Sequence, residues 1–139
     1  MNVAFFLIPK NEVICLTLDT TMRQALERME RHSYSAVPLV DQQGRYAGTI
    51  TEGDLLWKLK NTPGLTFENT HKISVKDIAL RIENEPVRID AKIDNLLSLA
   101  ITQNFIPVVD DEGVFIGIVR RREIIEYLGR QLLISNGTL

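Results

Sequence analysis

One pattern of residues occurs twice in this 139-residue chain. Residues 37–50 contain Val-Pro-Leu-Val-Asp, then Gly44, then Gly-Thr-Ile. The second copy starts at residue 106, 69 positions later, and contains Ile-Pro-Val-Val-Asp, Gly113 and Gly-Ile-Val. Because both copies must form the same local structure, the duplication predicts a fold made of two equivalent units.

The residues around the motif repeat as well. Asp19 corresponds to Asp90, with the offset now 71. Apolar residues then follow the i, i+3, i+4, i+7 spacing of an amphipathic helix. They are Met22, Ala25, Leu26 and Met29 in the first copy and Ile93, Leu96, Leu97 and Ala100 in the second. Further helical stripes are Leu55, Leu56 and Leu59, and Ile124, Ile125 and Leu128. With short apolar strands at 13–18 and 86–89, each copy is predicted to be strand, helix, strand, strand, helix.

This order predicts an α+β fold in which two small sheets pack together with pseudo-twofold symmetry and flanking helices. The expected boundaries are a first unit at residues 1–60, a linker at 61–72, a second unit at 73–132 and a frayed tail at 133–139. Residues 74–80 are expected to form a short helix, opened by Ser74 and Asp77. Residues 5–9 are expected ahead of the first unit.

Composition excludes several functional classes. The formal net charge of −2 provides no general positive field for nucleic acid or an acidic membrane. No apolar run is long enough to span a bilayer, and the apolar start is too short for a signal peptide, so a cytoplasmic protein is expected. Cys15 is the single cysteine, and His32 and His71 lack metal-ligand spacing. The sequence contains no recognisable catalytic set, so we expect no enzyme activity.

A hydroxyl and an acid open the helix that follows the first motif. Thr51 and Asp54 have the spacing of a capping box, in which each side chain bonds a backbone amide of the helix start. The same helix end could instead bind a phosphate, with Thr51 contacting phosphate and Asp54 the hydroxyls of a ribose. Both interpretations remain open on the sequence.

The second copy has arginines at the equivalent place. Arg120, Arg121 and Arg122 cannot cap amides, because guanidinium groups have no acceptor, and cations are disfavoured at a helix start. A bound anion would explain them. The alternative is a solvated network with nearby acids, which are Asp110, Asp111, Glu112, Glu123 and Glu126.

Aromatic residues precede the two central strands. Tyr34 and Ser35 lie before the first, and Phe105 begins the second. Such residues can stack on or hydrogen-bond to a flat base, but the sequence by itself favours ordinary packing at the edge of the core.

These motifs together resemble the cystathionine-β-synthase-type (CBS) domain pair, and the resemblance covers nearly the whole chain. Leu7-Ile8-Pro9, Tyr34 to Pro38 and the arginine run are similar to stand-alone CBS proteins of Gram-positive bacteria that bind cyclic di-AMP. Those relatives have Thr-Arg-Arg where this chain has Arg120 to Arg122. The family places two clefts between its units. One would use Thr51, Asp54, Val87, Phe105 and Ile106. The other would use Ile14, Tyr34, Ser35, Ala36, Val37, Arg120, Arg121 and Arg122.

The resemblance implies a regulatory sensor that binds an adenine nucleotide, such as cyclic di-AMP, AMP or ATP, as ligand rather than cofactor. It also implies a homodimer and an effector protein whose identity the sequence does not give. The alternative is an interaction module with empty clefts that serves for dimerisation alone.

Overall fold

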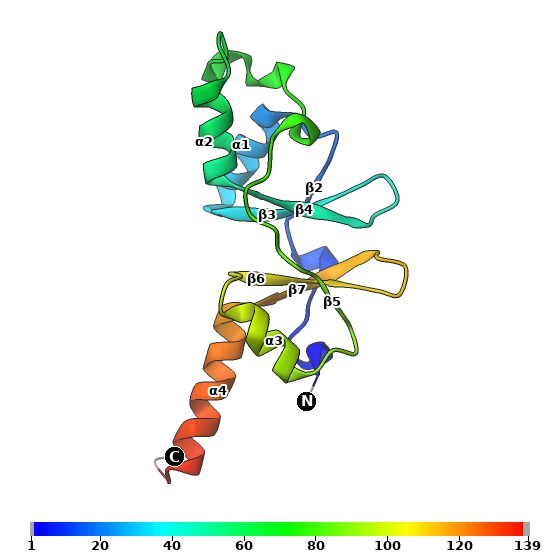
Figure 1. The fold of residues 1–139 in the computed structure, drawn as a ribbon, viewed down its shortest axis with the longest axis vertical. Coiled ribbons are helices and arrows are strands. Elements are labelled where there is room, and N and C mark those ends of the chain that lie inside the picture. The colour runs from blue at the N-terminus through cyan, green and yellow to red at the C-terminus, as the bar shows by residue number, and fades with distance from the viewer. Residues whose placement is uncertain (1, 138–139) are drawn as a thin grey trace. The chain divides into compact units, whose positions relative to one another are not determined.

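The computed structural model describes residues 2–137 and contains two compact units. The first-repeat unit is formed by residues 14–83. The second-repeat unit is formed by the residues up to 13 and those from 84 onward. Each unit combines one small sheet with helices, which confirms the predicted α+β class and the duplication (Figure 1).

The sheet of the first-repeat unit has the strand order β2-β3-β4. β2 is parallel to β3, and β3 is antiparallel to β4. Two helices cover one face of this sheet (Figure 1). The elements are β2 (Leu16–Thr17), α1 (Met22–His32), β3 (Ala36–Val40), β4 (Tyr46–Thr51), α2 (Glu52–Asn61) and the 3₁₀ turns η3 (Phe67–Lys72) and η4 (Val75–Asp77).

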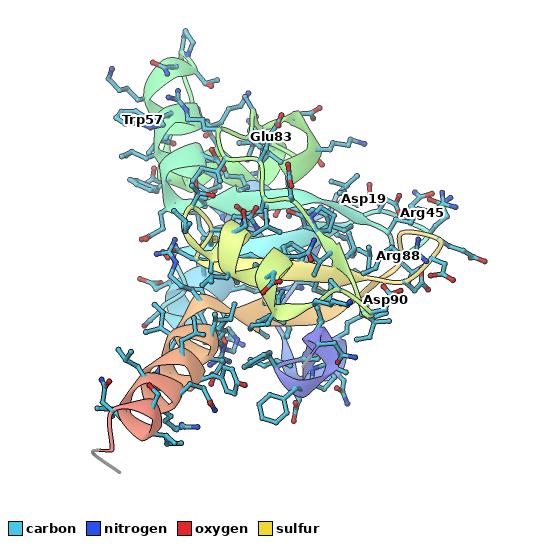
Figure 2. The ribbon with its side chains drawn as sticks, turned by 60° about the horizontal axis from the view of Figure 1, so that its bottom comes forward. Asp19, Arg45, Trp57, Glu83, Arg88 and Asp90 are labelled. Atoms are coloured by element: carbon cyan, nitrogen blue, oxygen red, sulfur yellow. The ribbon has the colours of Figure 1, made fainter. Side chains whose placement is uncertain are left out.

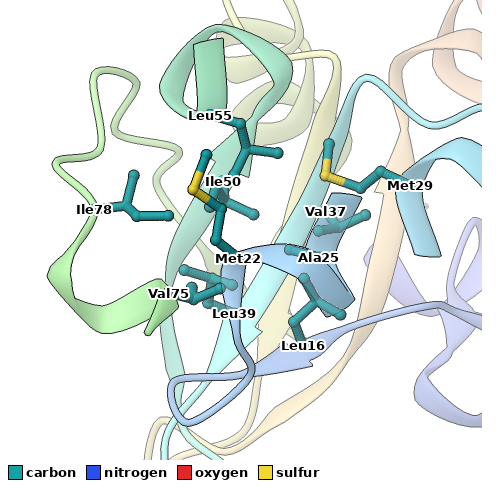
Figure 3. Close-up of a cluster of buried hydrophobic side chains, with 10 residues drawn as sticks. All are labelled: Leu16, Met22, Ala25, Met29, Val37, Leu39, Ile50, Leu55, Val75 and Ile78. Atoms are coloured by element: carbon teal, nitrogen blue, oxygen red, sulfur yellow. The ribbon is translucent and has the colours of Figure 1, made fainter. Parts of the chain in front are cut away.

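Helix α1 packs its apolar stripe on this sheet, as predicted. Met22, Ala25 and Met29 are buried and join the cluster drawn in Figure 3. The other members are Leu16, Val37, Leu39, Ile50, Leu55, Val75 and Ile78. Leu56 of the α2 stripe stays outside this core and is 53% exposed. Burial of this cluster, at roughly 25 cal/mol per Å² of apolar surface, stabilises the unit without any contribution from a disulfide.

The sheet of the second-repeat unit has the order β1-β7-β6-β5. Its β5, β6 and β7 match β2, β3 and β4, with the same parallel and antiparallel pairings. The core includes Leu96, Ile106, Val119 and Ile124. The elements are η1 (Val3–Phe5), β1 (Ile8–Pro9), η2 (Lys10–Glu12), β5 (Val87–Arg88), α3 (Ile93–Ala100), β6 (Phe105–Val109), β7 (Phe115–Arg120) and α4 (Arg121–Ser135).

The N-terminal segment belongs to the second-repeat unit, whereas the sequence boundaries place residues 1–60 in the first. Strand β1 pairs antiparallel with β7, with Ile8 opposite Ile118 and Pro9 opposite Gly117. Gly117 permits this pairing, because a Cβ there would lie 2.2 Å from the carbonyl oxygen of Ile8. Val3 and Phe6 complete the attachment by entering the core of that unit.

Residues 61–83 also differ in detail from the expected linker and helix. The helix predicted at 74–80 is wrong, because only the turn η4 forms there. The Ser74 hydroxyl donates to the carbonyl of Leu18 at 2.9 Å and is therefore not a cap. In the expected tail, residues 133–135 continue α4, and residues 138–139 lie outside the described part.

The glycine in the middle of α4 offers a stability test. Gly129 has open space where a Cβ would stand. Since glycine disfavours a helix by about 0.8–1.0 kcal/mol relative to alanine, Gly129→Ala should raise the free energy of unfolding by about 0.5–1 kcal/mol. Urea unfolding of both proteins would measure the change. An unchanged or lower midpoint would contradict a continuous helix through residue 129.

Candidate functional site

The Thr51 motif forms a complete capping box at the start of α2. The Thr51 hydroxyl accepts from the backbone N–H of Asp54 at 3.2 Å, and the Asp54 carboxylate accepts from the N–H of Thr51 at 2.9 Å. The structural interpretation of this motif is therefore confirmed. Any ligand contact would have to be made in addition to these bonds or in place of them.

The carboxylate of Asp54 has a further partner that the sequence did not suggest. Its second oxygen accepts from the backbone N–H of Arg81 at 3.0 Å, and the residue is only 1% exposed. Both oxygens are thus engaged with backbone amides of the same unit. A carboxylate enclosed in this way has no open surface for the two hydroxyls of a ribose.

The strand entry and the helix start meet at one end of the hairpin β3-β4. Ala36 lies opposite Thr51 in the strand register, and the N–H of Glu52 donates to the carbonyl of Ser35 at 3.0 Å. Ser35 is exposed beside this junction. The first-repeat unit therefore brings the side chains of Ser35 and Thr51 to one edge of its sheet.

Tyr34 lies beside the same junction and is 39% exposed. Its ring is stacked with the ring of His32, with centroids 5.4 Å apart and planes at 16°. The sequence left His32 as an isolated residue, because nothing in its spacing indicates a partner. A base that stacks on Tyr34 must use the other ring face or replace His32.

Tyr34 also borders a groove between α1 and α2 with a volume of about 710 Å³. Apolar side chains dominate its walls, and Glu52 and Gly53 of the helix start lie at its edge. The remaining lining residues are Met22, Leu26, Met29, Glu30, Ser33, Leu55, Leu56, Leu59 and Phe67. The groove is an exposed apolar surface of the first-repeat unit.

The arginine run occupies the equivalent edge of the second-repeat unit. Phe105 lies opposite Arg120, and the N–H of Arg121 donates to the carbonyl of Asn104 at 2.9 Å. This is the same junction that Glu52 and Ser35 form in the other unit. The duplication therefore extends to the hydrogen bond that ties each helix start to its strand entry.

The three guanidinium groups have different environments. Arg121 is half-buried, and its Nε donates to the carbonyl of Gln103 at 3.0 Å. Arg122 is exposed and pairs with Glu126 across one helical turn at 3.1 Å. Within residues 2–137, Arg120 has no ion pair. The cluster thus keeps positive charge available at the helix start.

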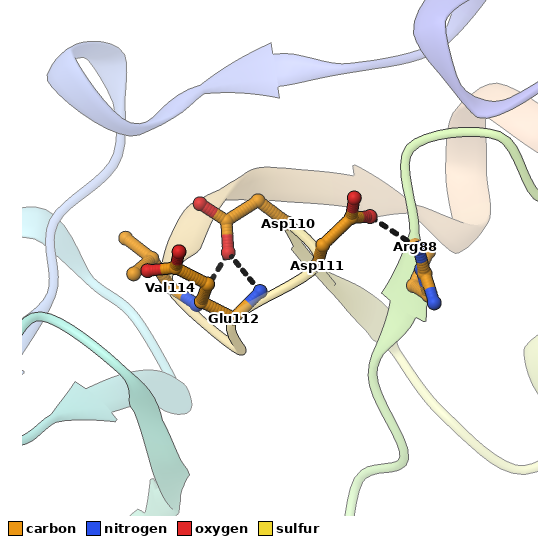
Figure 4. A network of polar contacts seen from close by, with 5 residues as sticks. All are labelled: Arg88, Asp110, Asp111, Glu112 and Val114. Carbon is orange, nitrogen blue, oxygen red and sulfur yellow. Dashed lines mark hydrogen bonds and ion pairs between the residues drawn. The ribbon is translucent and has the colours of Figure 1, made fainter.

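The neighbouring acids neutralise this cluster only in part. Asp110 closes its own turn by accepting from the N–H groups of Glu112 and Val114 at 2.8 and 2.9 Å (Figure 4). Asp111 pairs with Arg88. Among these acids, Glu126 forms an ion pair with the run, through Arg122.

The remaining predicted site residues lie in the two cores or in and beside the strands. Val37 and Ile106 are 1% and 0% exposed and belong to the two cores. Phe105 is 8% exposed, so its ring is not an open stacking platform. Val87 pairs with Val108 in the sheet, and Ile14 lies just before β2. A ligand contact at these residues stays a prediction.

Comparison with protein families identifies the family to which the two repeats belong. The model of the CBS domain matches residues 7–61 and 73–130, that is, both repeats. The chain belongs to the CBS-domain family. Each matched range contains one of the two hairpins described above.

Similar proteins share this CBS pair over most of their length. The chain is 25% identical to cyclic di-AMP receptor B of Bacillus subtilis, over 94% of this chain and 88% of that one. Among solved structures, CbpB of Listeria monocytogenes in complex with cyclic di-AMP has a TM-score of 0.81 at 21% identity, covering 95% and 98%. CBSX2 in complex with AMP has a TM-score of 0.72 at 23% identity, covering 93% and 96%.

None of the helices within residues 2–137 has the length and apolar character needed to cross a bilayer. In the same part of the chain, no three histidine, cysteine or acidic side chains are grouped as a metal site.

Proposed function

We propose that this CBS pair is a regulatory sensor that binds an adenine nucleotide, with cyclic di-AMP as the first candidate. The observation that carries the proposal is the duplicated hairpin edge, with hydroxyl groups at one helix start and guanidinium groups at the other. Capping explains the first helix start. It does not explain three consecutive arginines, for which a bound anion would be a favourable partner.

The proposal assigns to two ligand sites the residues that the family resemblance implies. In one, Arg121 and Arg122 bind phosphate, while Tyr34 and Ser35 bind the base, with Ile14, Ala36 and Val37 beside them. The guanidinium groups suit phosphate because they donate two parallel hydrogen bonds to it. At the other site, Thr51 binds phosphate, and Asp54 binds ribose once its carboxylate is uncovered. The strand entries Val87, Phe105 and Ile106 line that second site.

Arg120 supports a ligand with more than one phosphodiester. It adds a third cation at a helix start where Arg121 and Arg122 already stand, and each phosphodiester needs its own charge partner. The named ligand of the Bacillus receptor, cyclic di-AMP, has two such groups. AMP, the ligand in the CBSX2 complex, has a single phosphate and would use fewer of these contacts.

Titration calorimetry with cyclic di-AMP, AMP, ATP and S-adenosylmethionine would test the proposal. We expect saturable binding of cyclic di-AMP, and about 2.7 kcal/mol of added stability at a hundredfold excess over its Kd. Thermal melting would report this as a shift of several degrees. If none of the four compounds releases heat or shifts the melt, the chain is better described as an interaction module with empty clefts.

A partner protein would distinguish the ligand-bound from the ligand-free form and so receive the signal. The proposal includes a homodimer, for which the apolar groove between α1 and α2 is a suitable surface, since Leu56 and Phe67 are 53% and 65% exposed there. The proposed function gives no residue a catalytic role. Mass measurement by light scattering, with and without cyclic di-AMP, would determine the oligomeric state.

A further inference from the structure

The segment 81–85 connects the two compact units along the chain, and it is held at both ends by residues next to the nucleotide motifs. At one end the N–H of Arg81 donates to Asp54 at 3.0 Å. At the other end Gln103 bonds both the N–H and the carbonyl of Glu85, at 2.8 and 3.1 Å. We call residues 81–85 the strap.

The strap has no regular secondary structure, and Asp54 and Gln103 each hold one end of it through hydrogen bonds. Gln103 is only 4% exposed, and its amide also donates to the carbonyl of Phe105 at 3.3 Å. The backbone carbonyl of Gln103 accepts from Nε of Arg121 at 3.0 Å. Hydrogen bonds that are buried in this way are strong, and removing one partner leaves the other unsatisfied.

The Arg81 end carries a second contact. The Arg81 guanidinium lies 5.4 Å from the ring centroid of Trp57, a cation–π distance. Trp57 projects from α2, and Glu83 lies within the strap (Figure 2). Because Trp57 is the single tryptophan of the chain, its fluorescence reports directly on this end of the strap.

We propose that the strap closes over Asp54 in the ligand-free protein, and that nucleotide binding at Asp54 releases the Arg81 end. This inference rests on the proposed function. Asp54 is 1% exposed and both its oxygens are bonded, so ribose hydroxyls reach it only when Arg81 withdraws. Release at Arg81 loosens the segment that joins the two repeats. Ligand binding thereby becomes a change that a partner protein can recognise.

Hydrogen exchange at single amides, with cyclic di-AMP and with AMP as probes, tests this inference. Saturation should speed exchange of the Arg81 amide at least about tenfold, as expected for loss of one bond to a charged group. The Arg45 amide is the internal control. It is held by the Asp41 carboxylate at 2.9 Å within the same unit, where we propose no ligand contact, and should not change.

Two variants separate the ends of the strap. Asp54→Asn keeps the size of the side chain but leaves one acceptor oxygen for two amides, so Arg81 should exchange fast without any nucleotide. Gln103→Ala should release Glu85 and leave Arg81 protected. Nucleotide should also change the Trp57 fluorescence of the natural protein, and Arg81→Ala should abolish that change.

Calorimetry on the same samples separates this inference from the proposed function. Measurable binding of either probe with unchanged or slower exchange at Arg81 would contradict release of the Arg81 end. The proposed sensor function would remain intact. Absence of binding by both probes would overturn the strap together with the nucleotide-sensor proposal.

Discussion

Gly117→Ala should lower the free energy of unfolding by about 3 kcal/mol, which is on the order of 10 °C in Tm for a chain of this size. The added Cβ would lie 2.2 Å from the carbonyl oxygen of Ile8 and 2.8 Å from Cδ1 of Leu7. The first of these atoms is backbone, so the clash is relieved only when β1 moves away from β7. The φ of +156° adds strain for any residue with a Cβ.

The repeat provides a matched control for this substitution. Gly48 is the counterpart of Gly117 and has a φ of +138°, but a Cβ there would meet only Cδ1 of Leu80, at 2.7 Å. The end of a leucine side chain can rotate aside. Gly48→Ala should therefore cost about 1–2 kcal/mol, for backbone strain and repacking.

Urea unfolding and trypsin sensitivity would measure the difference. In Gly117→Ala, release of β1 should speed trypsin cleavage after Lys10, whereas Gly48→Ala should leave the rate of this cleavage unchanged. Equal losses of stability in the two variants would mean that the pairing of β1 with β7 does not depend on the glycine.

Arg121→Ala should weaken binding of cyclic di-AMP about 10- to 100-fold. A charge-assisted hydrogen bond contributes about 1.5–3 kcal/mol, and each 1.4 kcal/mol corresponds to a factor of ten in Kd. Arg121 is the half-buried member of the run, and its Nε is already fixed by the Gln103 carbonyl. The remaining donors of the fork are therefore held in one orientation for phosphate.

Arg130→Ala is the matched control, because it removes the same charge from the same helix. Arg130 lies nine residues further along α4, about 13 Å by helical rise, and pairs there with Glu126. Its removal should change the Kd by less than about twofold, through general electrostatics. Calorimetry at fixed ionic strength would compare the variants, with melting curves to show that each is folded. Equal Kd values for both would place the phosphate site elsewhere.

Arg121→Lys adds information about geometry. It keeps the positive charge but loses the planar fork, so it should recover only part of the affinity. Full recovery would indicate that charge alone, and not a paired hydrogen bond, binds the ligand.

Much of the fold followed from local pattern. The duplication, the helical stripes of α1 and α3, and the turns at Gly44 and Gly113 are all written within short stretches of sequence. The Thr51 capping box was equally readable, since its two partners are three residues apart. Periodicity and turn chemistry carry such features because they involve near neighbours.

Other features depended on partners distant in the sequence. Only in the folded chain does Ile8 pair with β7. The same holds for the hydrogen bonds of Asp54 with the Arg81 amide and of Gln103 with Glu85. The Gly48-Thr49-Ile50 pattern and its copy indicated strands, but not that one of them would accept an extra strand.

The sequence alone determined the repeated unit and the chemistry of its two helix starts, because neighbouring side chains set both. The tertiary structure decided which backbone amides donate hydrogen bonds to the Asp54 carboxylate and which unit the N-terminal strand joins. Those choices depend on shape and on hydrogen-bond partners brought together from distant positions, and a local pattern does not record them.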